Sequence, residues 1–457
     1  MKLCTWMSLS LVAVISLFAG STIAADDADM AKRIEALEKK LGQLADIVAA
    51  QQKELQATRK ANSELHAKLG ETVTQAVKAE VLKDADKRTD RRANVWANLD
   101  IQVYGKIKAD AAVDTSRTNT GNFARWVEHE STNEDDHELN ITAKETRLGM
   151  KITGPELNGA KTSGVIEIDF YGGGGENKAN PMLRHAFMKI DWVEQGLSLI
   201  AGQTWDVISP LNPTTLNYSV QWWAGNIGYR RPQIRLTKVG DLGNDVTYKL
   251  EGAIARNIGH DSDFDPGDSG EDSALPSLQG RASLTFPFIN GKKATFGVSG
   301  HYAREEYDID ATGGNLDADS WSANLDMDVP ILDWLRIKSE IFTGQNLDAY
   351  LGGIGQGAVV TADDRMYEIH GTGGWIAASL GPWGPWSFNV GYSGEFINDS
   401  HVGPEARTCN SAIFGNALYR INANTLIGVE VSRWRTEYKD EETGDSLRVQ
   451  TSFIYQF

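Results

Sequence analysis

Three arginines lie within six residues in the segment Gly228–Lys238, which reads GYRRPQIRLTK. Side chains alternate between the two faces of a strand, so Arg231 and Arg235 share one face and Arg230 lies on the other, toward lipid or an interface. The first face also carries Tyr229 and Gln233, and the second carries Pro232, Ile234 and Leu236. A guanidinium is always charged and offers a planar pair of donors to a carboxylate or phosphate. If the apolar face meets lipid, this strand predicts an anion-binding track inside a pore, with a bulge at Pro232.

Other basic residues occur at alternating positions of further predicted strands. They are Lys106, Lys108, Arg147, Lys151, Lys249, Arg281, Arg336 and Lys338. Any one of them could be an ordinary hydrated residue of a water-filled lumen. Together with Arg231 and Arg235 they predict a preference for anions, because a ring of cations partly replaces the hydration of a passing anion.

The segment before the arginine strand, Val207–Gly225, reads VISPLNPTTLNYSVQWWAG and combines turn-forming prolines with large aromatic residues. Its notable residues are Pro210, Pro213, Tyr218, Trp222 and Trp223. One interpretation is a surface loop covered by aromatic side chains. The other is a loop that folds into the lumen and forms the constriction of the pore.

Enzymatic and metal-binding patterns find little support. The sequence contains no GxSxG, HExxH or P-loop motif, which are the commonest signatures of hydrolases and nucleotide-binding enzymes. Glu167 and Asp169 could do acid–base chemistry, but they could equally balance lumen arginines. Asp261–Asp272 has the acidic alternation of a calcium loop, yet Pro266 stands where the sharp-turn glycine should be. We therefore expect a solvated acidic loop, no metal site, no cofactor and no enzyme.

Composition and the first residues indicate an exported protein. The chain has 457 residues and a formal net charge of −17, which argues against nucleic acid as a partner. Lys2 precedes the apolar run Trp6–Phe18 and the small residues around Ala24, so residues 1–25 are predicted to be a signal peptide. The alternative, a membrane anchor, needs roughly 20 apolar residues. Of two cysteines, only Cys409 would remain after cleavage, so no disulfide framework is expected.

Residues 26–87 are predicted to form a coiled coil in the periplasm, followed by a charged linker over 88–98. Apolar residues recur at heptad positions a and d. The seam contains Ile34, Leu37, Leu41, Leu44, Val48, Leu55, Asn62, Leu65 and Leu69. A single helix cannot bury so narrow a stripe, so we expect a homo-oligomer whose strand number the heptads leave open. The alternative is a solvated single helix.

From residue 99 to 457 the period of apolar residues changes to two, as in Leu148, Met150 and Ile152. About sixteen such segments are expected: 99–114, 139–153, 161–173, 182–191, 196–206, 227–238, 244–257, 277–287, 292–305, 318–330, 333–344, 370–381, 385–398, 409–421, 425–438 and 446–457. Short connections alternate strictly with long polar ones, and aromatic residues flank the segments. This pattern predicts an all-β transmembrane barrel of antiparallel strands rather than a soluble β-domain.

Four segments resemble a known family. They are AGQTW at Ala201–Trp205, GYRRPQIRLT at Gly228–Thr237, ETRLGMK at Glu145–Lys151 and GVIEIDFYG at Gly164–Gly172. With the order signal peptide, coiled coil and barrel, they resemble the DcaP-like porins of Gram-negative outer membranes. The resemblance implies a homotrimer with one pore per subunit that passes small organic anions such as dicarboxylates. It also implies that Arg231 and Arg235 act as constriction arginines.

Two functions of different kinds follow from these observations. The first is a passive, anion-preferring diffusion porin in the outer membrane, in contact with lipid and lipopolysaccharide. The second is a structural tether, because a coil rising 1.5 Å per residue would extend roughly 80 Å into the periplasm toward cell-wall or periplasmic components.

Overall fold

The protein is described by a computed structural model that covers residues 99–457 except 134–135, 175–176, 258–269, 310–313, 362–364 and 399, together with Lys39, Lys53, Gln56 and Lys60. The predicted signal peptide and most of the predicted coiled coil and linker therefore lie outside the described residues. The barrel belongs to a compact unit that spans Asn94–Phe457.

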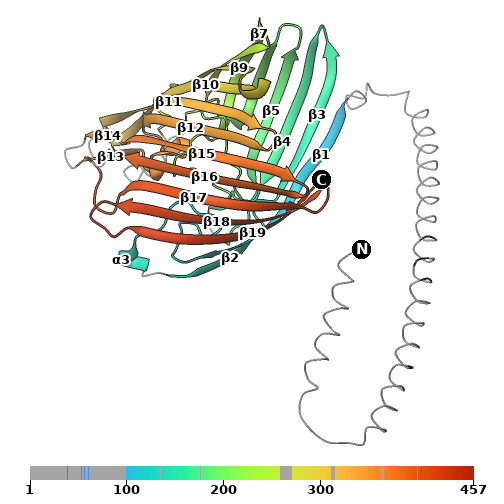
Figure 1. The fold of residues 1–457 in the computed structure, drawn as a ribbon. Coiled ribbons are helices and arrows are strands. Elements are labelled where there is room, and N and C mark those ends of the chain that lie inside the picture. The colour runs from blue at the N-terminus through green and yellow to red at the C-terminus, as the bar shows by residue number, and fades with distance from the viewer. Residues whose placement is uncertain are drawn as a thin grey trace, which may run out of the picture. The chain divides into compact units, whose positions relative to one another are not determined.

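The described part of this unit is dominated by one closed antiparallel sheet (Figure 1). Its strands are β1 (Asp100–Asp114), β2 (Glu138–Thr142), β3 (Arg147–Leu157), β4 (Ala160–Asp169), β5 (Met182–Trp192), β6 (Leu197–Trp205), β7 (Arg230–Gly243), β8 (Val246–Ala255), β9 (Ser277–Pro287), β10 (Lys293–Ile309), β11 (Gly314–Leu332), β12 (Leu335–Gln345), β15 (His370–Trp383), β16 (Trp386–Ile397), β17 (Arg407–Arg420), β18 (Thr425–Tyr438) and β19 (Gly444–Gln456). The described elements that are not strands of the barrel wall are α3 (Glu130–Asn133), the hairpin of β13 (Ala358–Val360) and β14 (Met366–Glu368), and three 3-10 turns.

Closure of the sheet defines a barrel of sixteen strand positions. β1 pairs with β19 from Lys106–Gln456 to Asp114–Arg448. On its other edge β1 pairs with β3 through Asp100–Lys106 and with β2 through Asp110–Asp114, so β2 and β3 form one interrupted strand of the wall. The sequence prediction of a sixteen-stranded antiparallel barrel is confirmed.

The predicted strand spans agree closely with the structure, and β9 and β18 match them at both ends. The main error concerns the predicted outer loop 306–317. β10 and β11 continue pairing through Ile309 and Gly314, so only four residues separate them. Charged residues such as Glu306 and Asp317 suggested a loop, but they pair directly across the two strands. The hydrogen bonds of a sheet join backbone groups, so they also form between residues with charged side chains.

The outer face of the barrel is apolar, as two-residue alternation requires. Val103, Leu139 and Ile141 are each more than 60% exposed, and they would contact lipid. Beside the short turns, the ring centroids of Trp334 and Trp383 lie 5.8 Å apart. Aromatic residues at this level are typical of a membrane interface. No helix within the described residues has the length and apolar character needed to cross a membrane.

The interior holds three segments that connect strands, and each packs buried apolar residues inside the wall. They are 115–129, 206–229 and 346–357, the last with its 3-10 turns Asp348–Tyr350 and Gly353–Gly355. One cluster joins Ile208 and Ile227 to Leu347 and Tyr350. Another joins Phe123 and Trp126 to Trp222 and Trp223. The three segments therefore fill part of the lumen as one packed body.

Candidate functional site: a lumen occupied by inward loops

The segment 206–229, called here the crossing loop, spans the interior and bonds to several strands of the wall. Buried glutamates on the inner face receive its backbone N–H groups. Leu211 N donates to Glu340 Oε1 at 2.7 Å, and Leu216 N donates to Glu430 Oε2 at 2.6 Å. A carboxylate is a strong acceptor for backbone N–H groups, so these two glutamates fix the course of the loop.

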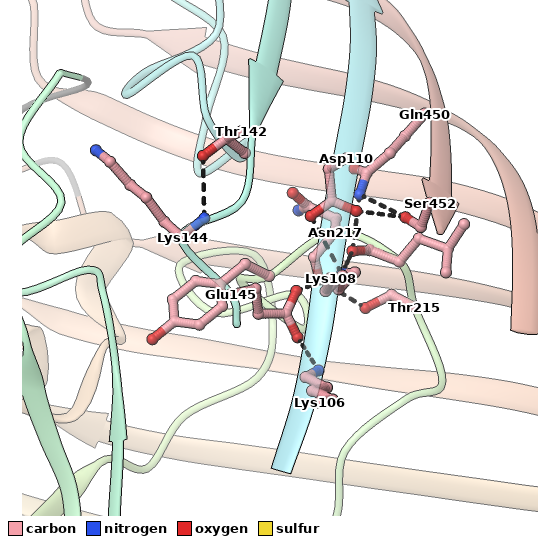
Figure 2. A network of polar contacts seen from close by, with 12 residues as sticks. Lys106, Lys108, Asp110, Thr142, Lys144, Glu145, Thr215, Asn217, Gln450 and Ser452 are labelled. Carbon is pink, nitrogen blue, oxygen red and sulfur yellow. Dashed lines mark hydrogen bonds and ion pairs between the residues drawn. The ribbon is translucent and has the colours of Figure 1, made fainter. Parts of the chain in front are cut away.

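A second set of contacts holds the same loop at Leu216, through residues of β1 and β19. Lys108 Nζ donates to Leu216 O at 2.7 Å, and Gln450 Nε2 donates to it at 2.9 Å. Figure 2 shows Lys108 beside Glu145, which also accepts from Lys106 at 2.5 Å. Lys108 and Lys106 point inward as predicted, but Glu145 neutralises much of their charge and Lys108 is buried.

The predicted constriction residues lie in or beside this packed interior. Trp222 and Trp223 are buried against Phe123 and Trp126 rather than displayed on an outer surface. Tyr218 stacks on Tyr171 with ring centroids 4.0 Å apart. Pro213 is buried and Pro210 is exposed. Of the two interpretations of this segment, the geometry favours the loop that folds into the lumen.

Arg231 points inward, as strand alternation predicts, but its side chain is fully buried. Its Nε lies 2.8 Å from Asp206 Oδ1, its Nη2 donates to Ala349 O at 3.0 Å, and its guanidinium covers the ring of Tyr350 at 3.9 Å. This position corrects the expectation of a solvent-facing filter residue. A buried charge needs partners, and those of Arg231 come from the start of the crossing loop and from segment 346–357. Arg231 therefore joins these two segments.

Arg230 corrects a second expectation, since it does not face lipid. Its guanidinium is buried and lies 4.6 Å from the ring centroid of Trp205 and 4.9 Å from that of Tyr229. Arg230 is the first residue of β7 and pairs with β6 only, since pairing with β8 begins at Gln233. Pairing on one side enforces the alternation of side chains less strictly. Cation–π contacts with the inward aromatic residues then determine the direction of the side chain.

The other members of the arginine strand bond to neighbouring side chains and to the neighbouring backbone. Arg235 is partly buried, donates to Gln233 Oε1 at 2.9 Å and lies 3.7 Å from Glu251. Gln233 Nε2 donates to Trp205 O at 2.9 Å. Tyr229 lines a cavity described below. Pro232 pairs with Gln203 in a regular register, so the bulge predicted at Pro232 is absent.

The remaining predicted cations face inward, and most have carboxylate partners. Arg281 Nη2 lies 2.7 Å from Asp326, Arg336 Nη2 donates to Asp328 at 2.6 Å, and Arg147 lies 3.6 Å from Glu145. Lys151 is exposed, 5.1 Å above the ring of Tyr104, and Lys338 is partly buried. The lumen is therefore less cationic than its basic residues alone suggest.

Glu167 and Asp169, the candidate acid–base pair, hold an arginine that sequence reasoning missed. Arg184 Nε donates to Glu167 Oε1 and its Nη1 donates to Asp169 Oδ2, both at 2.7 Å. Arg184 lies where the register of β4 and β5 shifts by one residue, so a bulge turns it inward. The arrangement is a buried ion-pair network. Most of the acidic loop Asp261–Asp272 lies outside the described residues, and the described residues contain no cluster of three metal-ligating side chains.

A cavity of about 200 Å³ lies between the crossing loop and segment 115–129. Aromatic side chains dominate its lining: Phe123, Tyr171, Tyr218, Trp222, Trp223 and Tyr229. Arg125 also lines it, with its guanidinium 4.5 Å from the ring centroid of Trp223. Burial, and then the nearby charge of Arg407, lower the pKa of Arg125 to about 10, so the side chain stays cationic at neutral pH. Within the described residues, Arg125 forms no ion pair with a carboxylate.

Sequence reasoning missed Arg125 because it lies in a connection rather than in an alternating strand. The signal was nonetheless present in NTGNFARWVEH, where an arginine stands between Phe123 and Trp126. Arg407, at the start of β17, continues this arrangement, since its guanidinium lies 4.1 Å from the ring centroid of Trp126. Two arginines and several aromatic rings thus meet in the interior.

Comparison with known proteins agrees with this architecture. The family model described as DcaP outer membrane protein matches residues 54–265. The crystal structure of the outer membrane channel DcaP of Acinetobacter baumannii is 20% identical, and its alignment covers 79% of this chain and 98% of that chain with a TM-score of 0.64. The trimer form of OmpT from Vibrio cholerae is 8% identical, with 79% and 100% of the two chains covered and a TM-score of 0.50. No curated protein matched.

The closed sixteen-stranded barrel, its apolar outer face and its inward loops give the chain the fold of an outer-membrane porin. The chain is similar to the DcaP family model over residues 54–265, and its fold is similar to that of the DcaP channel. The family model is described as an outer membrane protein, and the DcaP structure is described as an outer membrane channel.

Proposed function

We propose that the protein is a passive diffusion porin that prefers small organic anions such as dicarboxylates. The observation that carries this proposal is Arg125, a cation without a carboxylate partner among the described residues, which lines the aromatic cavity in the narrowed interior. Most other inward cations are neutralised by carboxylates. Arg125 would attract an anion without competition from a fixed partner, and the aromatic walls would keep its binding weak enough for release.

Reversal potentials of single channels in a potassium chloride gradient would test the proposal. We expect anion selectivity for the wild type and a clear shift toward cations in Arg125→Gln. Arg256→Gln is a matched control, because Arg256 is an exposed arginine 3.8 Å from Glu271. Cation selectivity of the wild type, or equal shifts in both variants, would contradict the proposal.

Liposome swelling would define the solute class. We expect faster entry of small dicarboxylates than of neutral sugars of similar size, and loss of that difference in Arg125→Gln. Swelling by sugars serves as the control for an intact pore. Equal entry of neutral and anionic solutes into wild-type liposomes would show that no charge preference exists.

We also propose that the protein assembles as a homotrimer with the predicted coiled coil as a second contact. The heptad seam over 26–87 supports self-association, and the OmpT neighbour is described as a trimer form. Native mass spectrometry of the detergent-extracted full chain would give the subunit number. A monomeric mass would refute this part of the proposal.

A further inference from the structure

Three arginines lie together on the outer face of the barrel, two on β18 and one just beyond the end of β1, with β19 between these strands. Arg433 and Arg435 belong to β18, where they alternate with the buried residues Ser432 and Trp434. Arg117 follows β1 and continues the outward alternation of Val113 and Thr115, with Ser116 buried between them. The side chains of these arginines are 57%, 61% and 50% exposed for Arg117, Arg433 and Arg435.

Strand register brings the three side chains to one place. Arg435 pairs with Asp445 of β19, and Arg433 pairs with Leu447. Thr115 N in turn donates to Leu447 O at 3.1 Å, which places Arg117 beyond this pairing at the level of Asp445. We call Arg117, Arg433 and Arg435 the outer arginine cluster. It lies at the end of the wall that carries the long loops, since β18 leads into the connection 439–443.

The cluster borders an apolar belt on the same outward face. Ile413 and Leu447 pair directly with Arg433, and Val113, Val431 and Val449 lie two residues further toward the middle of the wall; all five are at least 40% exposed. An arginine facing hydrocarbon destabilises a barrel in proportion to its depth. The boundary of the hydrocarbon must therefore lie no higher than Arg433, which puts the arginines at the level of the outer head groups.

The partners of the three arginines are partly exposed carboxylates. Arg433 Nη2 lies 2.6 Å from Asp445, Arg435 Nε 3.3 Å from Glu437, and Arg117 Nε 3.6 Å from Glu138. Exposed ion pairs contribute little net stability, so an incoming phosphate can take their place. A guanidinium binds the oxygens of a phosphate through two parallel hydrogen bonds, and three of them can hold more than one phosphate.

We propose that the outer arginine cluster binds the phosphate groups of lipid A, the anchor of lipopolysaccharide in the outer leaflet. Its acyl chains lie along the apolar belt of β17, β18, β19 and β1 below the cluster. The proposal concerns the outside of the barrel and stands whether or not the lumen prefers anions. Two features carry it: three forked donors on neighbouring strands, and an apolar surface continuous with them.

The test measures lipid A binding to the purified full chain in detergent by native mass spectrometry, with bisphosphorylated lipid A as the probe. We expect each arginine to contribute about fivefold to affinity, as a basic side chain at an anionic membrane surface does. The triple variant Arg117→Gln, Arg433→Gln, Arg435→Gln should therefore bind on the order of a hundredfold more weakly. Arg304→Gln is the matched control, because Arg304 also faces outward and pairs with Asp319 at 2.8 Å.

Further measurements show whether the phosphate groups and the outer arginine cluster account for lipid A binding. Lipid A from which both phosphates have been removed should bind the wild type no better than it binds the triple variant. Binding that is unchanged in the triple variant, or reduced equally in Arg304→Gln, would overturn the proposal. It would also be overturned if the triple variant lost its oligomeric mass while lipid A binding persisted, since the cluster would then be a subunit contact. Far-UV circular dichroism of each variant checks that the barrel is intact.

Discussion

Removal of the Arg231 side chain should loosen the packed interior rather than abolish ion selectivity. Arg231 and Asp206 are both fully buried and lie 2.8 Å apart. Arg231→Met leaves Asp206 as an uncompensated buried charge, and breaking such a pair by removing one partner costs about 3–5 kcal/mol. Even the lower figure raises the population of a displaced crossing loop roughly a hundredfold. We therefore expect larger and noisier single-channel currents.

A double-mutant cycle tests whether the unpaired charge of Asp206 causes the change in single-channel current. Asp206→Leu combined with Arg231→Met removes both charges and leaves apolar groups of similar size, which is often nearly neutral for a buried pair. The double variant should therefore recover most of the quiet current of the wild type. The assay is a planar bilayer recording of conductance, current noise and reversal potential for all four proteins.

If Arg231→Met shifts the reversal potential strongly toward cations while conductance and noise stay at wild-type values, Arg231 contacts the permeating ions and the structural interpretation is wrong. Arg235→Gln is a useful comparison, since Arg235 retains some exposure and bonds to Gln233. Its variant should change the current noise much less.

Gly225→Ala should displace the crossing loop, because Gly225 has φ +108° and an added Cβ would lie 2.3 Å from Gly374 O. The expected result is a lower yield of folded protein, measured by gel mobility with and without heating. A normal yield and a normal conductance would contradict the prediction. The anion preference that depends on Arg125 should be constant between about pH 6 and about pH 9. The pKa of Arg125, although lowered, is about 10, so its side chain stays charged over this range. Reversal potentials of the wild type and of Arg125→Gln, measured across this range, check the prediction. Deletion of residues 26–87 should reduce the oligomeric mass and leave single-subunit conductance unchanged, whereas a loss of envelope integrity with normal conductance would support the tether.

The barrel wall could be predicted because lipid on one side and water on the other impose strict alternation on every strand. β9 and β18 begin and end where that alternation begins and ends. The same rule gave the inward direction of Arg231 and Lys108. It failed at Arg230, where the strand starts and aromatic contacts decide the direction of the side chain.

The interior could not be predicted to the same degree, because alternation says which face a residue occupies but not what it meets there. Asp206 and Tyr350, which surround Arg231, come from two connections far apart in the sequence. Glu145 pairs with Lys108, and Glu430 accepts a hydrogen bond from Leu216 N of the crossing loop. Neither contact follows from the alternation of residues along a strand. Arg125 lies in a connection that has no period at all, so its place beside Trp223 depends on tertiary packing.

The seam between β1 and β19 has a consequence for assembly. The pair Asp114–Arg448 at this seam is separated by 334 positions in the chain, whereas other pairings of the barrel wall join strands that follow one another. The local hairpins can form early, but the seam closes a very long loop and must form late. Until then the sheet has two unpaired edges, which are templates for aggregation. Both edges would need protection by a chaperone or by the membrane insertion machinery until closure.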